Sequence, residues 1–134
     1  MDLSVILNVG SDATLLDTRR MILQAAGYIV ESANSIDEAI ERFRLGDFDL
    51  VLLCHSLSER DRRRLISLIR ASGSGTPVVA VGYGPGQYSD GLADATLDSG
   101  PRDLISGVRN VLLRAAETSR LHVIPTGAIP AGDK

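Results

Sequence analysis

The chain contains five short runs of contiguous apolar residues, separated by longer segments in which apolar residues recur every three or four positions. A short unbroken apolar run suits a strand that is covered on both faces, and the longer spacing is that of an amphipathic helix. Strands that alternate with helices predict a doubly wound α/β domain, with one parallel sheet and right-handed crossovers. We predict strands over residues 3–9, 28–33, 49–54, 77–81 and 95–98.

Residues that favour helix ends lie between the predicted strands. Asp12 is placed to cap the first helix. Ser35, with Glu38 three positions later, forms a capping box for the second helix. Ser58 is an N-cap for the third helix, with Asp61 in its first turn. We therefore predict a helix after each of the first three strands.

The segment GYGPGQYSDG, residues 82–91, is rich in glycine where a fourth helix would be expected, so we predict that this helix is shortened or missing. Pro101 suits the first turn of the last helix, which we expect to end near Ala116. The prolines and glycines beyond it are expected to prevent a helix. We predict one domain over residues 1–117 and a flexible tail over residues 118–134.

Composition excludes several classes of function. The 134 residues fit one domain, and a net charge of −3 with a pI near 5.3 argues against direct nucleic-acid binding. The only lysine is Lys134 and the only cysteine is Cys54, so internal lysine chemistry and an internal disulfide are both excluded. Without a signal-like start or an apolar stretch of about 20 residues, we expect a cytoplasmic protein and no membrane partner.

In a doubly wound domain, the functional site lies beyond the carboxyl ends of the strands. The residues that follow or end the predicted strands there are the first candidates for a site. They are Gly10, Ser11, Cys54, Gly82 and Ser99.

Four segments resemble the receiver domain of bacterial response regulators (CheY-like). They are VILNVGSDATLLDTRRMILQAAGYIVESANSIDEAIE, DFDLVLLCHSLSERD, PVVAVGY and ADATLDSGPRDL. The resemblance extends over residues 3–116 and implies a flavodoxin-like sheet of order 2-1-3-4-5. It also implies a signalling role of the two-component or phosphorelay type, in which an aspartate after the third strand accepts a phosphoryl group.

The resemblance assigns a family role to each candidate residue. Gly10 and Ser11 stand where receivers have the acid pair that holds Mg²⁺, and Cys54 stands at the phosphoacceptor. Gly82 stands at the Thr or Ser that binds the phosphoryl oxygen, and Ser99 stands at the lysine. All five roles are unfilled. The resemblance therefore implies a degenerate pseudo-receiver that lacks the phosphorylation residues.

The chemistry of these residues leads to the same expectation. Mg²⁺ requires near-octahedral oxygen ligands, which glycine and a thiol do not offer. Asp12 alone would hold the ion poorly. Because phosphoryl transfer needs a metal or cationic groups to stabilise the developing charge, we expect no Mg²⁺, no cofactor and no enzymatic activity.

Three interpretations of Cys54 stay open. A buried structural cysteine is the commonest case for a free thiol. A reactive or redox-sensing thiol would need a cationic neighbour or a helix N-terminus. A zinc site would need three or four ligands, whereas the chain offers Cys54, His55 and the distant His122.

Two further surfaces are candidates. The backbone N–H groups of Gly10 and Ser11, with the glycine-rich segment 82–91, leave open a small-ligand site for a nucleotide-like anion, although the complete phosphate-loop motif is missing. Arginines at the start of the third helix form either a solvated face or a docking patch for an acidic protein. These are Arg60, Arg62, Arg63 and Arg64.

We therefore expect a non-catalytic receiver-like signalling domain that acts by binding a protein partner or a second copy of itself. The alternative is a small-ligand-binding or thiol redox-sensing α/β domain that uses the vacated cleft and Cys54.

Overall fold

The computed structural model describes residues 4–54, 56–82, 93–98 and 100–128, with the backbone alone at Asp98, Pro101 and 118–128. All five predicted strands are confirmed, with boundaries that shift by no more than two residues. The elements in chain order are β1 (Val5–Val9), α1 (Ala13–Ala25), β2 (Ile29–Ala33), α2 (Ile36–Leu45), β3 (Leu50–Cys54), α3 (Glu59–Ala71), β4 (Val78–Gly82), β5 (Ala95–Asp98) and α4 (Pro101–Ala128).

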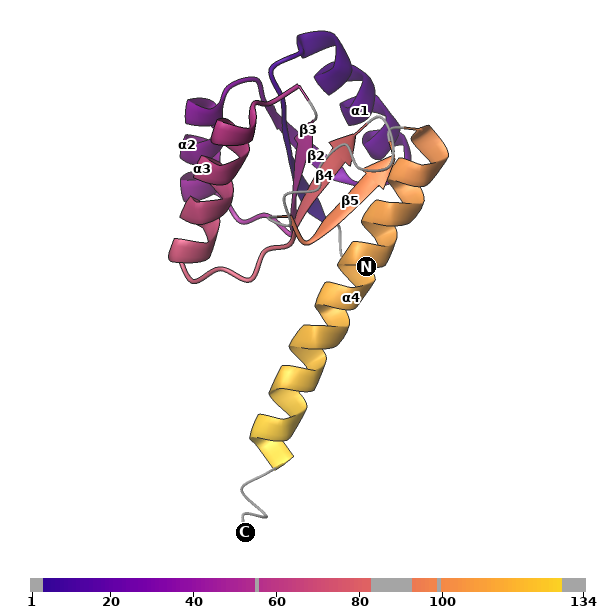
Figure 1. Cartoon of the computed structure of the whole chain (residues 1–134). Coiled ribbons are helices and arrows are strands. Elements are labelled where there is room, and N and C mark those ends of the chain that lie inside the picture. The colour runs from indigo at the N-terminus through magenta and orange to yellow at the C-terminus, as the bar shows by residue number, and fades with distance from the viewer. Residues whose placement is uncertain (1–3, 55, 83–92, 99, 129–134) are drawn as a thin grey trace.

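The five strands form one parallel sheet of order β2-β1-β3-β4-β5 (Figure 1). This is the flavodoxin-like order that the sequence predicted. β3 lies at the centre, and every one of its residues is buried. Its unbroken apolar sequence, LVLLC, is what a strand between two helical layers requires, because both of its faces are removed from water.

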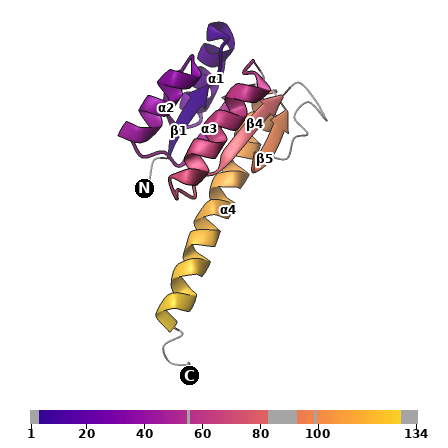
Figure 2. The ribbon, with the colours of Figure 1, turned by 60° about the vertical axis from the view of Figure 1, so that its left-hand side comes forward.

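Alternate residues of the strands point to opposite faces and divide the core into two halves. α2 and α3 cover one face, and α1 and α4 cover the other (Figures 1 and 2). In β3, Val51 and Leu53 pack on the α2 and α3 side, whereas Leu50 and Leu52 pack on the α1 and α4 side. Cys54 continues this alternation, so its side chain points toward the α1 and α4 side.

The predicted helix caps are confirmed. Asp12 Oδ1 accepts the first free N–H groups of α1, and Ser58 Oγ accepts the Asp61 N–H at 3.1 Å. Ser35 Oγ accepts the Glu38 N–H at 3.1 Å. The carboxylate of Glu38 reaches back one residue further than in a standard capping box, to the N–H before the cap.

The predicted end of the last helix was wrong. α4 runs from Pro101 to Ala128, so residues 117–128 are helical. Residues 116–124 contain neither proline nor glycine, and Pro125 and Gly127 therefore affect only the last turn. Residues 129–134 lie outside the described part of the chain, and the boundary between domain and tail at residue 117 stays a prediction.

The predicted loss of a helix between the fourth and fifth strands falls on residues 83–92, which lie outside the described residues. Among the helices that the structure describes, none is long and apolar enough to cross a membrane.

Glu38 joins the start of α2 to the preceding loop and to its own second turn. Its carboxylate accepts the Asn34 N–H at 3.0 Å and a hydrogen bond from Arg42 at 3.0 Å. The bond from Asn34, followed by that from Arg42, holds the pKa of Glu38 below its ordinary value of 4.5. A lowered carboxyl pKa contributes stability above the unfolded-state pKa, and this contribution is lost as the pH falls through the folded-state value.

We expect Glu38→Gln to lower the free energy of unfolding at pH 7 by about 0.5 kcal/mol, a small value because both partners are partly exposed. Denaturant unfolding of both proteins at pH 7 and at about pH 2 measures the effect. The difference between them should shrink at the lower pH, because protonation of Glu38 removes the contribution of its carboxylate. An equal difference at both pH values would contradict this assignment.

Candidate functional site

The carboxyl ends of β1, β3 and β4 meet at one edge of the sheet. The register pairs Val9 with Leu53 and Cys54 with Val81. Gly10, Ser11, Cys54 and Gly82 are therefore gathered at this edge, as the topology predicted. Ser99 lies outside the described residues, so its predicted place beside them stays a prediction.

Gly10 and Cys54 are in close contact. A Cβ atom added to Gly10 would lie 2.7 Å from Cys54 Cβ and 3.4 Å from its Sγ. Distances below 3.0 Å between such atoms are essentially never observed. The Cβ of Cys54 is attached directly to the backbone of β3, so it cannot rotate out of the way. The Cβ of Cys54 therefore occupies the space in which a side chain at position 10 would begin.

Ser11 and Ser56 join the loops that follow β1 and β3. The Ser11 N–H donates to Ser56 Oγ at 2.9 Å, and Ser11 Oγ donates to the Ser56 carbonyl at 2.7 Å. The Asp12 N–H also donates to Ser56 Oγ, at 3.3 Å. The N–H of Gly10 donates to the Ala33 carbonyl at 3.1 Å. The N–H groups of Gly10 and Ser11, which were proposed as an anion cradle, thus already have partners within the protein.

Arg19 is a functional candidate that the sequence analysis missed. It lies on α1, is only 3% exposed, and its Nη1 donates to Cys54 Sγ at 2.6 Å. Its position follows from helical spacing, because Leu16, Arg19 and Leu23 form the buried stripe of α1. A charged residue in the middle of an otherwise apolar stripe was the signal that could have identified it.

The pairing of Arg19 with a thiol is unusual for a buried cation. Among the described residues, no carboxylate forms an ion pair with Arg19. A buried guanidinium is costly to desolvate without an anionic partner. The sulfur of Cys54, which is 1% exposed, is therefore a structural acceptor in the core, in agreement with the prediction of a buried cysteine.

The described residues contain no group of three or more His, Cys, Asp or Glu side chains that could hold a metal ion. Asp12 uses Oδ1 to cap α1. His55 and the side chain of His122, which the zinc interpretation required, lie outside the described residues.

Arg62 does not belong to a surface patch, contrary to our expectation. Its side chain is 8% exposed, and Nη1 donates to the Leu57 carbonyl at 3.1 Å. The position lies on the same helical stripe as Leu65 and Ile69, so the stem of the arginine packs into the core while its head binds the loop after β3.

The other three arginines of the cluster are exposed. Arg63 pairs with Glu59 of the same helix at 2.7 Å. Arg64 pairs with Asp37 of α2 at 3.3 Å. These pairs agree with the interpretation of a solvated face, and Arg60, Arg63 and Arg64 remain as the accessible basic surface.

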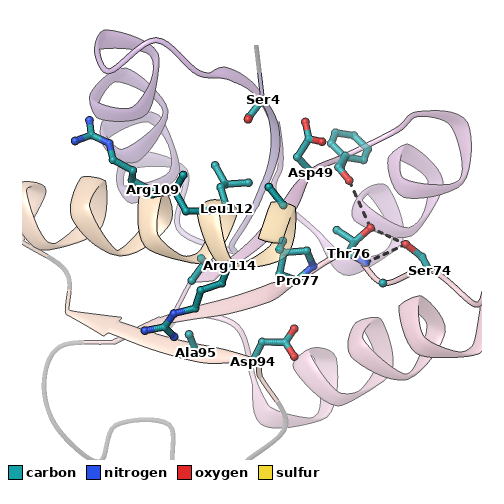
Figure 3. A pocket seen from close by; sticks show the side chains of 16 residues that line it. Ser4, Asp49, Ser74, Thr76, Pro77, Asp94, Ala95, Arg109, Leu112 and Arg114 are labelled. Carbon is teal, nitrogen blue, oxygen red and sulfur yellow. Dashed lines mark hydrogen bonds between the residues drawn. The ribbon is translucent and has the colours of Figure 1, made fainter. Parts of the chain in front are cut away.

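A cleft of about 1160 Å³ opens at the opposite edge of the sheet, beside α4 (Figure 3). Its two carboxylates are engaged by the backbone, since Asp49 accepts the Val5 N–H at 2.7 Å and Asp94 accepts the Val78 N–H at 2.7 Å. Asp94 also pairs with Arg70 at 2.8 Å. These hydrogen bonds satisfy backbone N–H groups at the amino ends of β1 and β4. The cleft lies between these strand ends and the part of α4 that extends past the sheet.

No protein-family profile and no curated protein sequence matches the chain. Solved structures do match it. A CheY-like receiver domain of Methanospirillum hungatei is 26% identical, with a TM-score of 0.75 over 87% of this chain and 99% of that chain. CheY4 of Vibrio cholerae is 18% identical, with a TM-score of 0.73 over 82% and 99%. TrrA of Thermotoga maritima, solved in complex with Mg²⁺ and BeF, is 21% identical, with a TM-score of 0.71 over 82% and 99%.

These matches cover almost the whole length of each receiver domain. The sheet order, the two helical layers and the length of the matched part are shared. The chain therefore has the fold of CheY-like response regulator receiver domains, as the resemblance implied.

The contact between Gly10 and Cys54 predicts that position 10 tolerates no side chain. We expect Gly10→Ala to lower the free energy of unfolding by about 1–3 kcal/mol, the usual cost of overpacking a core. Gly75→Ala is the matched control, because a Cβ there meets no atom within 4 Å, and it should leave stability unchanged or raise it by up to about 1 kcal/mol. Equal denaturation midpoints for the two variants would contradict the predicted contact.

The hydrogen bond between Arg19 and Cys54 predicts that substitutions of the two residues affect stability in different directions. Cys54→Val removes the sulfur acceptor from a buried guanidinium and should cost about 1–3 kcal/mol. Arg19→Met removes a buried cation that has no carboxylate partner among the described residues, so it should be neutral or stabilising. Thermal and denaturant unfolding measure both, and a large loss with Arg19→Met would show that the charge itself is needed.

Proposed function

We propose that this chain is a pseudo-receiver: a non-catalytic signalling domain of the two-component type that acts by binding other proteins without being phosphorylated. The receiver fold supports a place in two-component signalling. The residues at the carboxyl edge of the sheet support the absence of phosphoryl chemistry. We further propose that the domain comprises residues 1–117 and works in the cytoplasm of a bacterial cell.

One observation carries this proposal. Cys54 packs against Gly10 so closely that no acidic side chain fits at position 10, and Ser56 takes up the neighbouring N–H groups of Ser11 and Asp12. The described residues at this edge thus pack against one another and satisfy their own N–H groups, which supports a site that does not bind a metal-bound phosphoryl group. Mg²⁺ requires oxygen ligands in octahedral geometry, and Gly10 and Cys54, which the structure describes at this edge, supply none.

The same residues argue against a phosphorylation-dependent switch. A switch needs a ligand that binds one of two conformations better than the other. Gly82, at the end of β4, has no side chain that could move toward a phosphoryl group. We therefore propose a domain with one conformation, whose binding to partners is constitutive. Arg60, Arg63 and Arg64 are the proposed contact surface for an acidic protein.

The small-ligand and redox alternative is less well supported. An anion cradle would need the N–H groups of Gly10 and Ser11, which already donate to the Ala33 carbonyl and to Ser56 Oγ. Reactive cysteines are partly exposed, whereas Cys54 is buried. Arg19 does give Cys54 the cationic neighbour that a reactive thiol needs, but both side chains are buried, which favours a structural role for the pair.

Incubation with Mg²⁺ and acetyl phosphate tests the proposal. We expect intact-mass spectrometry to detect no stable phosphoryl adduct on the wild-type protein. Cys54→Asp should also stay unmodified, because Gly10 and Ser11 still supply no carboxylate for Mg²⁺ and Arg19 would pair with the new carboxylate. A receiver domain with an intact acid pair is the positive control. A stable, Mg²⁺-dependent adduct on the wild-type protein would overturn the proposal.

A further inference from the structure

α4 is much longer than its contact with the sheet. Its 28 residues correspond to about 42 Å of helix. Leu104, Val108 and Val111 pack into the core on the α1 and α4 side. The second half of the helix projects away from the body of the domain in both views (Figures 1 and 2).

The projecting segment is a poor helix former by composition. Residues 118–127 include threonine, serine, β-branched residues, proline and glycine, all of which rank low in helix propensity. Short helices of this kind are unstable in water unless one face packs on another surface. Because the segment extends beyond its own domain, we infer that the stabilising surface belongs to another chain.

The outer face of α4 carries an unpaired apolar residue between two opposite charges. Leu113 is 61% exposed. It lies across the helix from the buried residues Val108 and Val111, at the open side of the cleft beside α4. Arg109 lies one turn before Leu113 and Glu117 lies one turn after it. Both are exposed.

This pattern is complementary to itself in one orientation only. If two α4 helices pack in parallel, Arg109 meets Arg109 and Glu117 meets Glu117. If they pack antiparallel about a two-fold axis at Leu113, the two Leu113 side chains meet and each Arg109 faces Glu117 of the other copy. A two-fold interface requires such self-complementarity, in which residue i contacts j and j contacts i.

We propose that two copies of this chain form a dimer through the outer faces of their α4 helices, packed antiparallel about Leu113. The inference rests on the proposed function in one respect, namely that the chain acts through protein contacts. In this pair, a residue that follows Leu113 in one copy lies opposite the residue that precedes Leu113 by the same number of positions in the other copy. Residues 117–125 of one copy therefore run beside residues 101–109 of the other. The projecting half of each helix thereby gains the surface that its own domain does not provide.

The helix ends add a second electrostatic match. The last turn of α4 contains no basic residue to complement the negative end of the helix dipole. In the antiparallel pair, this end lies near Arg102 of the other copy, which is exposed on the first turn of α4. The dimer therefore supplies the charge that the single helix lacks.

Sedimentation equilibrium of the full chain tests the dimer. We expect the wild-type protein to be dimeric and Leu113→Glu to be monomeric. Arg109→Glu and Glu117→Arg should each weaken dimerisation by about tenfold, and the double variant should return to within about threefold of the wild type. All of these residues are exposed, and circular dichroism and thermal melting check that the variants fold.

Disulfide trapping tests the orientation. We expect a mixture of Arg109→Cys and Glu117→Cys to form cross-linked dimers under mild oxidation, and each variant alone to form far fewer. The wild-type protein, whose only thiol is the buried Cys54, is the control. Preferential cross-linking of each variant with itself would indicate a parallel pair and overturn the proposal.

A wild-type protein that stays monomeric at about 0.1 mM, or a dimer that survives Leu113→Glu, would also overturn it. These results would leave the pseudo-receiver assignment in place, because the phosphorylation assay reports on the opposite region of the molecule.

Discussion

The contact between Gly10 and Cys54 decides what the carboxyl edge of this sheet can contain. β1 and β3 lie side by side at the centre of the sheet, and the strand spacing brings the last residues of both together. With the two strand ends this close, the Cβ of Cys54 leaves room for only a glycine at position 10. Any side chain at position 10 would therefore need the two strand ends to move apart.

The neighbouring polar groups follow from that constraint. The loops after β1 and β3 join through Ser11 and Ser56. The sulfur of Cys54 becomes the acceptor for the buried guanidinium of Arg19. A buried arginine would normally need an anionic partner. Here Arg19 lies beside Cys54, at the strand end where the resemblance places the aspartate of receivers. The sheet keeps a hydrophobic layer on each of its two faces.

The sequence predicted the parts of this structure that depend on local signals. Unbroken apolar runs identified the strands, and short polar residues such as Ser35 and Ser58 identified the helix starts, because both effects act over a few residues. The bond between Ser11 and Ser56 joins positions 45 residues apart, and no local pattern indicates it. Arg19 was missed because a charge on an apolar stripe is usually assigned to the surface. The predicted end of α4 was too early, because Pro125 and Gly127 were expected to prevent a helix in residues 117–124 as well.

Paramagnetic relaxation with Mn²⁺, a substitute for Mg²⁺, tests most directly whether the carboxyl edge is closed to divalent cations. In ¹H–¹⁵N spectra of the wild-type protein, the account predicts that the amide signals of Gly10, Ser11 and Cys54 keep their intensity when Mn²⁺ is added at millimolar concentration. Selective, saturable broadening of these three signals would contradict it.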